Sequence, residues 1–252
     1  MADTLVRMKD VSFVYHDISG ENKAVADLNL DVKSGEFISI VGPSGCGKTT
    51  VLSMLSGIIT PTSGTIEVNS KQIGYMLQRD HLLDWRTIED NVFLSLQVKG
   101  LMSDETKRNS LELLRRYDLY SFKDSYPRQL SGGMRQKVAL IRTLAFSPSL
   151  LLLDEPFSAL DFHTRLKLAD EIYDIIRKEK KTAILVTHDI SEAISMSERV
   201  LVFSKRPAHV KSEYKMNFTK DTPPFMRRSD NGFKDCFDMI WSDIDDEENN
   251  NT

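Results

Sequence analysis

The run Gly42–Thr49, with the sequence Gly-Pro-Ser-Gly-Cys-Gly-Lys-Thr, most constrains the fold of this chain. It follows the apolar segment Phe37–Val41, which predicts a strand, and it precedes the helical pattern Thr50–Leu55. Glycines allow consecutive backbone N–H groups to point inward, and the start of a helix adds a partial positive charge. The run therefore predicts a phosphate-binding loop between a strand and a helix.

Each residue type in this loop has an expected role. Lys48 is expected to reach the outer phosphates, and the Thr49 hydroxyl to ligate Mg²⁺. A GTPase would also need an Asn-Lys-x-Asp motif, which the sequence lacks, so ATP is the expected nucleotide. Cys46 contributes a backbone N–H, and its thiol would make the loop sensitive to alkylation. The residues expected to bind ATP are Gly42, Pro43, Ser44, Gly45, Cys46, Gly47, Lys48, Thr49 and Thr50.

Two adjacent carboxylates follow the leucine run Leu150–Leu153. A continuous apolar run of this length is typical of a buried parallel strand, which delivers the residues at its end to the ligand crevice. Asp154 is therefore expected to hold Mg²⁺, and Glu155, turned the other way, to polarise the attacking water. The alternative is an acidic turn with no role in chemistry.

Two polar side chains end neighbouring apolar runs. His188 follows Ala183–Thr187, where it would contact the γ-phosphate and orient water, or simply begin a helix. Gln78 follows Ile73–Leu77, where its amide would sense metal and water as a ligand of Mg²⁺, or lie on the surface as an ordinary glutamine.

The remaining pattern predicts an α/β fold, a P-loop NTPase core with a mainly parallel sheet, an antiparallel β subdomain and an inserted helical subdomain. Strands are expected at Leu5–Tyr15 and Thr65–Val68, and a crossover helix at Thr164–Lys180. Residues 79–146 contain no good strand and include a helix opened by Ser103. No internal repeat is present, which excludes solenoid and propeller folds.

Composition narrows the cellular setting. The formal net charge is -4, and the five acidic residues between Asp243 and Glu248 account for it. The rest of the chain is therefore near neutral, and its charge does not indicate binding to nucleic acid. Cys46 and Cys236 are far apart, which fits a reducing cytoplasm. No run approaches the roughly 18 apolar residues of a membrane span, and the N-terminus has no signal pattern. A membrane role would require a partner.

With these motifs occurs Leu-Ser-Gly-Gly-Met-Arg-Gln at residues 130–136, and together they resemble the ATP-binding cassette family over residues 5–205. The resemblance implies that Ser131, Gly132 and Gly133 cap the γ-phosphate of ATP held by a second copy or a homologous cassette, in a head-to-tail dimer. It makes residues 158–161 the D-loop. It also places Tyr15 against adenine, although Tyr15 beside Phe13 would equally suit packing on a strand face.

Within the family, the chain is similar to cassettes of nitrate, sulfonate, taurine and bicarbonate importers, and vitamin-precursor importers look much the same. The similarity includes residues 82–85 and 89–92, although Asp84 stands where a proline is usual. It implies a bacterial importer ATPase at the cytoplasmic face of the membrane, with two permease subunits contacting residues 79–100 and a solute-binding protein further out. The solute would be a small anion, sulfonate or vitamin precursor.

Two other classes of cassette remain as alternatives. A cassette acting on ribosomes or DNA usually has a tandem copy or a long coiled coil, and many exporter ATPases are fused to their membrane domain. The expected organisation is an ATPase domain over residues 1–205, with its helical subdomain at about 79–146, and a C-terminal extension over residues 206–252. That extension is expected to contain a helix near residues 233–241, built on Phe233, Phe237, Ile240 and Trp241, and a disordered acidic tail.

Overall fold

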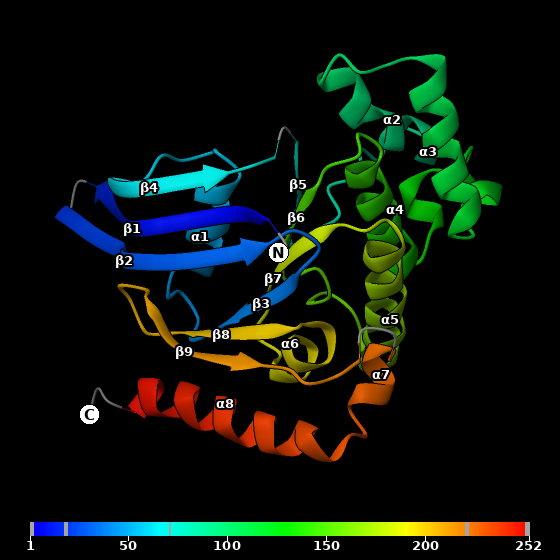
Figure 1. Ribbon diagram of the computed structural model, residues 1–252. Coiled ribbons are helices and arrows are strands. Elements are labelled where there is room, and N and C mark those ends of the chain that lie inside the picture. The colour runs from blue at the N-terminus through cyan, green and yellow to red at the C-terminus, as the bar shows by residue number, and fades with distance from the viewer. Residues whose placement is uncertain (1–2, 18–19, 71, 220–221, 250–252) are drawn as a thin grey trace.

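The protein folds as two β-sheets flanked by helices, seen in a computed structural model that describes residues 3–17, 20–70, 72–219 and 222–249 (Figure 1). The strands are β1 (Thr4–Asp17), β2 (Gly20–Lys33), β3 (Phe37–Val41), β4 (Ser63–Val68), β5 (Ile73–Met76), β6 (Leu150–Asp154), β7 (Thr182–Val186), β8 (Arg199–Phe203) and β9 (Val210–Lys215). The helices are α1 (Lys48–Leu55), α2 (Ile88–Val98), α3 (Asp104–Arg116), α4 (Gly132–Leu144), α5 (Phe162–Lys178), α6 (Ile190–Met196), α7 (Pro224–Arg227) and α8 (Asn231–Asn249), with 3-10 turns η1 (Tyr120–Phe122) and η2 (Pro127–Gln129).

The larger sheet has the strand order β5-β6-β7-β3-β8-β9. All neighbouring pairs are parallel except β8 and β9. Every residue of β3, β6 and β7 is buried, because helices cover both faces of this part of the sheet. Since these strands run in one direction, the loops after β3, β5, β6 and β7 all emerge at the same edge, where a ligand is expected.

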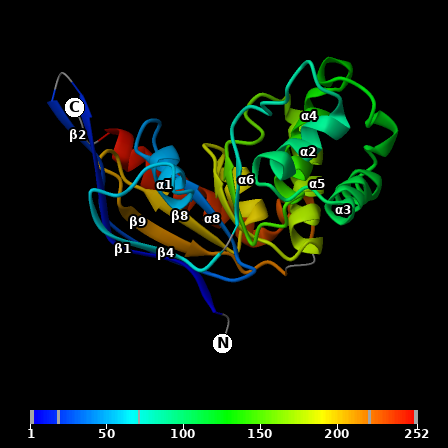
Figure 2. The ribbon, with the colours of Figure 1, turned by 90° about the horizontal axis from the view of Figure 1, so that it is seen from above.

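The smaller sheet is antiparallel, with the order β2-β1-β4. It lies beside α1, on the side of the molecule away from α2 and α3 (Figure 2). The sequence analysis did not predict β2, although Leu28, Leu30 and Val32 alternate with exposed residues as a half-buried strand requires. This pattern was therefore available in the sequence.

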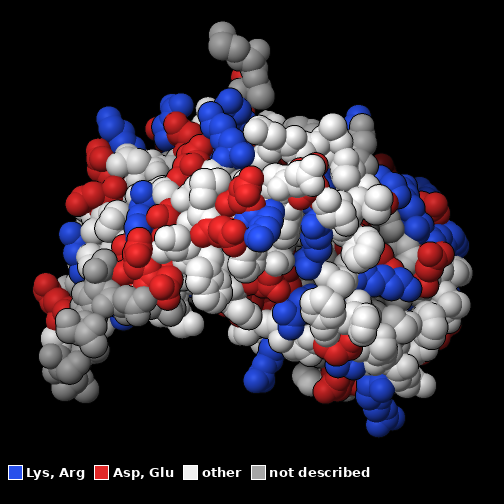
Figure 3. Space-filling model, turned by 90° about the horizontal axis from the view of Figure 1, so that it is seen from below, with Lys and Arg blue, Asp and Glu red and all other residues white. Residues whose placement is uncertain are grey.

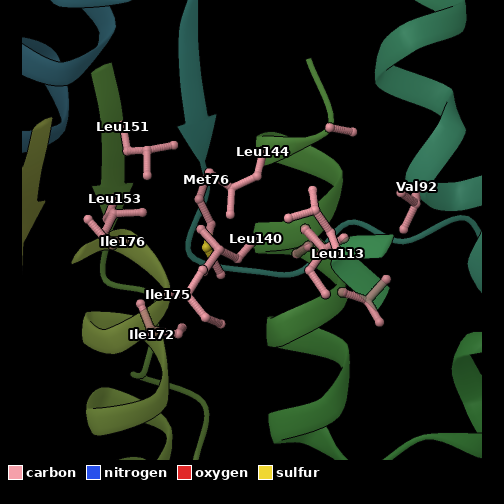
Figure 4. Packing of buried hydrophobic residues seen from close by; sticks show 14 of the residues in the cluster. Met76, Val92, Leu113, Leu140, Leu144, Leu151, Leu153, Ile172, Ile175 and Ile176 are labelled. Atoms are coloured by element: carbon pink, nitrogen blue, oxygen red, sulfur yellow. The ribbon is translucent and has the colours of Figure 1, made fainter. Parts of the chain in front are cut away.

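The elements between β5 and β6 are all helical, and they pack on the sheet through one apolar cluster. Leu140 and Leu144 of α4 point toward Met76 at the end of β5 and toward Ile175 of α5 (Figure 4). Helix α3 begins at the predicted cap, where the Ser103 hydroxyl accepts the Thr106 N–H. The predicted α/β class, with its parallel sheet, antiparallel sheet and inserted helices, is confirmed.

The C-terminal extension contains the predicted helix, but the expectation of a disordered acidic tail is wrong for the described residues. Helix α8 continues through the acidic residues to Asn249. Two of its carboxylates are paired: Asp243 accepts hydrogen bonds from Ser212 and Tyr214, and Glu247 accepts the Lys205 N–H at 2.9 Å. These contacts to β9 and the preceding turn offset the repulsion within the tail. Residues 250–252 lie outside the described residues.

Buried contacts also attach α7. Arg227 is 2% exposed and donates to the carbonyl oxygens of Ser195, Thr219 and Thr222 and to the Tyr173 hydroxyl.

The face on the α8 side of the molecule mixes acidic and basic side chains (Figure 3). Among the described residues, no helix is both long enough and apolar enough to cross a bilayer.

Candidate functional site

The loop between β3 and α1 has the backbone that the glycines predicted. Gly42 and Gly47 have φ angles of 153° and 127°. A Cβ on Gly47 would lie 2.8 Å from the Ala24 carbonyl oxygen, and one on Gly42 would lie 2.8 Å from that of Phe203. Larger residues are therefore excluded at both positions by backbone atoms as well as by conformation.

Lys48 begins α1 and is buried. Its Nζ donates to the carbonyl oxygens of Gly42 at 2.7 Å and Pro43 at 2.9 Å, within the same loop. The ammonium group is thus held inside the loop, next to the start of α1. This arrangement concentrates positive potential and suits a phosphate group.

Asp154 ends β6 beside the phosphate loop. Its Oδ1 accepts a hydrogen bond from the Thr49 hydroxyl at 3.3 Å, so the two residues expected to ligate Mg²⁺ are adjacent. Burial raises the pKa of Asp154, and the Thr49 hydrogen bond opposes that rise. A carboxylate and a hydroxyl are hard oxygen donors of the kind Mg²⁺ prefers, and the donor set fits that ion.

Tyr75 is a residue at this site that the sequence analysis missed. Its hydroxyl donates to Asp154 Oδ2 at 3.4 Å. Burial and the nearby Asp154 charge raise the pKa of Tyr75 to about 12, so the phenol remains a donor at neutral pH. Both oxygens of Asp154 therefore have hydrogen-bond donors, which fixes the orientation of the carboxylate.

Glu155, Gln78 and His188 meet at the same sheet edge. His188 Nδ1 lies 3.2 Å from Glu155 Oε2, and Gln78 Nε2 donates to that same oxygen at 3.3 Å and to Ser158 Oγ at 3.1 Å. Glu155 has a φ of 46°, and its N–H donates to the Val186 carbonyl oxygen at 2.8 Å. This left-handed backbone conformation, directly after the end of β6, directs the Glu155 side chain away from the Asp154 side chain.

A cavity of about 430 Å³ lies over the phosphate loop. Tyr15 forms part of its wall, with its hydroxyl 3.1 Å from Thr50 Oγ1, and its ring also packs edge-on against Phe13. The packing interpretation of Tyr15 therefore describes an observed contact, whereas its contact with adenine stays a prediction. Arg206 also lines the cavity, and the sequence analysis missed it. The lining residues are Tyr15, Ser44, Gly45, Gly47, Lys48, Thr49, Thr50, Glu155 and Arg206.

The predicted signature residues Ser131, Gly132 and Gly133 are not among the residues that line this cavity. They begin α4, where the Ser131 hydroxyl accepts the Met134 N–H at 3.3 Å. In Figure 2, α4 and α1 lie on opposite sides of the molecule. Within one chain, the structure therefore brings together the phosphate loop, the carboxylates, Gln78 and His188, but not the signature.

Comparison with known proteins identifies the kind of domain that carries this site. Residues 25–158 match a family model described as ABC transporter, and residues 122–195 match one described as AAA domain, putative AbiEii toxin, Type IV TA system. The chain is 43% identical over 251 residues to the uncharacterized ABC transporter ATP-binding protein YtlC of Bacillus subtilis (strain 168), with 96% of each chain covered.

Two similar proteins have names that include a solute. The taurine import ATP-binding protein TauB of Jannaschia sp. (strain CCS1) is 38% identical, over 80% of this chain and 78% of that protein. The nitrate import ATP-binding protein NrtD of Synechocystis sp. is 35% identical, over 86% and 84%. Among solved structures, a dimeric post-hydrolysis state of an ATP-binding cassette bound to ADP and Pi matches with a TM-score of 0.71 and 34% identity, covering 85% of this chain and 100% of that one.

Proposed function

Since this chain belongs to the ABC transporter ATP-binding family, whose members are ATPases, we propose that it is the ATP-hydrolysing subunit of a bacterial importer. The observation that carries the proposal is the contact of both Gln78 and His188 with one oxygen of Glu155, at a cavity lined by the phosphate loop. This arrangement holds a carboxylate next to the place where an outer phosphate would bind.

The proposed chemistry is attack of water on the γ-phosphorus. Glu155 accepts a proton from that water, the bond between the γ-phosphorus and the bridging oxygen breaks, and ADP leaves. Gln78 and His188 orient Glu155, and through it the water. Lys48 and the backbone N–H groups of residues 42 and 44–50 hold the phosphates, so catalysis depends mainly on positioning and charge stabilisation. Tyr15 contacts the adenine.

Thr49, Asp154 and Gln78 would hold Mg²⁺, which neutralises phosphate charge when bound. The hydrogen bond between Thr49 and Asp154 supports this assignment for two of the three residues. Gln78 contacts Glu155 and Ser158 instead, so its support as a metal ligand is indirect.

A complete site is proposed to need two cassettes. In that dimer Ser131, Gly132 and Gly133 of a second copy, or of a homologous cassette, would close the cavity over the γ-phosphate. Two observations support this: these residues do not line the cavity of their own chain, and the matched solved cassette is dimeric.

The importer assignment rests on relatives named for import of taurine and nitrate, and it includes two permease subunits and a solute-binding protein as partners. Trp85, which is 75% exposed, lies in the proposed permease contact at residues 79–100. The cassette would then be a peripheral protein of the cytoplasmic membrane face. The solute class we propose is a small anion or sulfonate, with a vitamin precursor as the second possibility. If the neighbouring genes encode no permease and no solute-binding protein, the importer assignment loses its support.

Glu155→Gln tests the catalytic assignment. The amide keeps the shape of the side chain but cannot accept the proton, so ATP hydrolysis should fall by at least about 100-fold while ATP binding remains. Because ATP is then retained, the variant should also run as a dimer in size-exclusion chromatography with ATP and Mg²⁺. Lys48→Ala is the matched variant, which should lose nucleotide binding itself. Near-normal turnover by Glu155→Gln would refute the role of Glu155.

A further inference from the structure

The turn between β8 and β9 forms part of the wall of the nucleotide cavity. Arg206, in this turn, is exposed and lines the cavity. Its guanidinium carbon lies 5.8 Å from the centre of the Tyr15 ring. Lys48 is the other basic residue of the cavity wall, and it already donates to carbonyl oxygens of its own loop. Arg206 therefore adds a second positive charge at the end of the cavity marked by Tyr15.

On one side, this turn is fixed to the phosphate loop and to β2. The Ala208 N–H donates to the Ala24 carbonyl oxygen at 2.9 Å, and the Ala26 N–H donates to the Ala208 carbonyl oxygen at 3.0 Å. The Ala208 side chain lies against the phosphate loop, since a Cβ on Gly47 would be 3.2 Å from that of Ala208. The backbone that carries Arg206 is thus packed directly on the loop that would hold the phosphates.

On its other side, the turn is held by the C-terminal helix. Glu247 of α8 accepts the backbone N–H of Lys205, the residue next to Arg206, at 2.9 Å. The other carboxylate oxygen of Glu247 lies 3.4 Å from Lys211 Nζ, which in turn donates to the Asp243 carbonyl oxygen at 2.7 Å. The Lys205 N–H, together with the Lys211 charge, lowers the pKa of Glu247 and keeps it ionised.

We propose that Arg206 is a nucleotide contact of this cassette, and that Glu247 of α8 is the positioning residue that holds it at the cavity. The proposal rests on the proposed function, because it takes the cavity to be the ATP site. A guanidinium is planar and always charged, so it both stacks on an aromatic face and pairs with phosphate. The ligand chemistry that suits Arg206 and Tyr15 together is the base and inner-phosphate end of an adenine nucleotide.

Titration calorimetry with ADP tests the contact. Arg206→Ala should weaken ADP binding about fivefold, and the loss should shrink as salt is raised, because an exposed charge is screened. Arg206→Lys keeps the charge but not the planar stack, and should lie between the wild type and Arg206→Ala. Lys215→Ala removes a charge from an exposed position on β9 and should leave ADP binding unchanged. Binding by Arg206→Ala that equals the wild type would overturn the contact.

A double-mutant cycle tests the positioning role. Glu247→Ala should weaken ADP binding about threefold when Arg206 is present and have no effect in the Arg206→Ala background. Asp246→Ala, an equal charge change at the exposed neighbouring position, should have no effect in either background. Equal losses from Glu247→Ala in both backgrounds would overturn the positioning role, since a general structural defect would not depend on Arg206.

Failure of this inference can be told apart from failure of the proposed function. If the wild type binds ADP and Lys48→Ala does not, but Arg206→Ala binds normally, only the inference is wrong. If the wild type does not bind ADP, the proposed function fails first. Circular dichroism melts of each variant show whether it is folded. If Arg206→Ala does not fold, Arg206→Gln takes its place, because it removes only the charge and part of the length of the side chain. Wild-type ADP affinity with the wild-type salt dependence in Arg206→Gln would then overturn the contact.

Discussion

Replacing Glu192 with glutamine tests whether a buried carboxylate beside the candidate site makes the stability of this protein depend on pH. Glu192 lies on α6 and is 3% exposed. Its Oε2 accepts the Thr187 hydroxyl at 2.7 Å, and its Oε1 lies 3.7 Å from Arg165 Nε. Burial, and then the neighbouring Asp189 charge, raise the pKa of Glu192 to about 7; the Thr187 hydrogen bond and the Arg165 charge oppose that rise.

The sign of the effect follows from which state binds more protons. The ordinary pKa of 4.5 applies to the unfolded chain, so between pH 4.5 and about 7 the folded protein holds a proton on Glu192 that the unfolded chain has lost. The free energy of unfolding must therefore fall as the pH rises through this window. A difference of about 2.5 pKa units corresponds to about 3 kcal/mol, of which roughly 2 to 3 kcal/mol falls between pH 5 and pH 8.

Urea denaturation of the wild type and Glu192→Gln at pH 5 and pH 8 measures this term. Glutamine cannot ionise, but its amide oxygen still accepts the Thr187 hydroxyl, so the variant should gain roughly 2 to 3 kcal/mol relative to the wild type on going from pH 5 to pH 8. Comparing the two proteins at each pH cancels the titration of all other groups. Glu67→Gln, at an exposed position on β4, should show no such gain. No gain in Glu192→Gln, or a loss, would show that Glu192 is ionised in the folded protein at both pH values.

Two further substitutions test packing, both by thermal and urea denaturation. Arg227→Ala should lower the free energy of unfolding by at least about 3 kcal/mol, because buried carbonyl oxygens lose their hydrogen-bond donor. The control Arg108→Ala, on the exposed face of α3, should change the free energy of unfolding by less than about 0.5 kcal/mol. Equal effects of the two substitutions would contradict the contacts of α7. Gly64→Ala should cost at least about 2 kcal/mol more than Gly57→Ala, since both have φ near 80° but only at Gly64 would a Cβ lie 2.3 Å from the Asp10 carbonyl oxygen. Similar costs would mean that the strand shifts to accept the methyl group.

The phosphate loop could be predicted in full because all of its determinants are local. A strand, a glycine-rich turn and a helix start follow one another within Phe37–Leu55, and the turn needs glycine where backbone atoms approach most closely. The position of Asp154 and Glu155 at the end of a strand was equally predictable, since the leucine run before them marks a buried strand. What the sequence does not contain is the contact between Gln78 and Glu155, which are 77 positions apart.

Residues outside the motifs were missed for the same reason. Tyr75 faces Asp154 because β5 pairs with β6 in a register that sets Tyr75 opposite Leu152, two residues before Asp154. Nothing in the local sequence specifies that register. Composition predicted a disordered acidic tail, but Asp243 is paired with residues of β9, 29 and 31 positions away. Charge counts along a chain do not reveal such partners.

The residues outside the motifs bear on how this chain sets its affinity for nucleotide. The motif residues supply chemistry that any cassette of the family needs, so they cannot distinguish one cassette from another. The wall of the cavity at Tyr15 is completed by a turn whose position depends on hydrogen bonds to β2 and to α8. These elements lie outside the motifs, so a substitution in them leaves the proposed catalytic residues in place. If Arg206 contacts the nucleotide as proposed, substitutions in its turn or at Glu247 should therefore change nucleotide affinity while every motif residue stays in place.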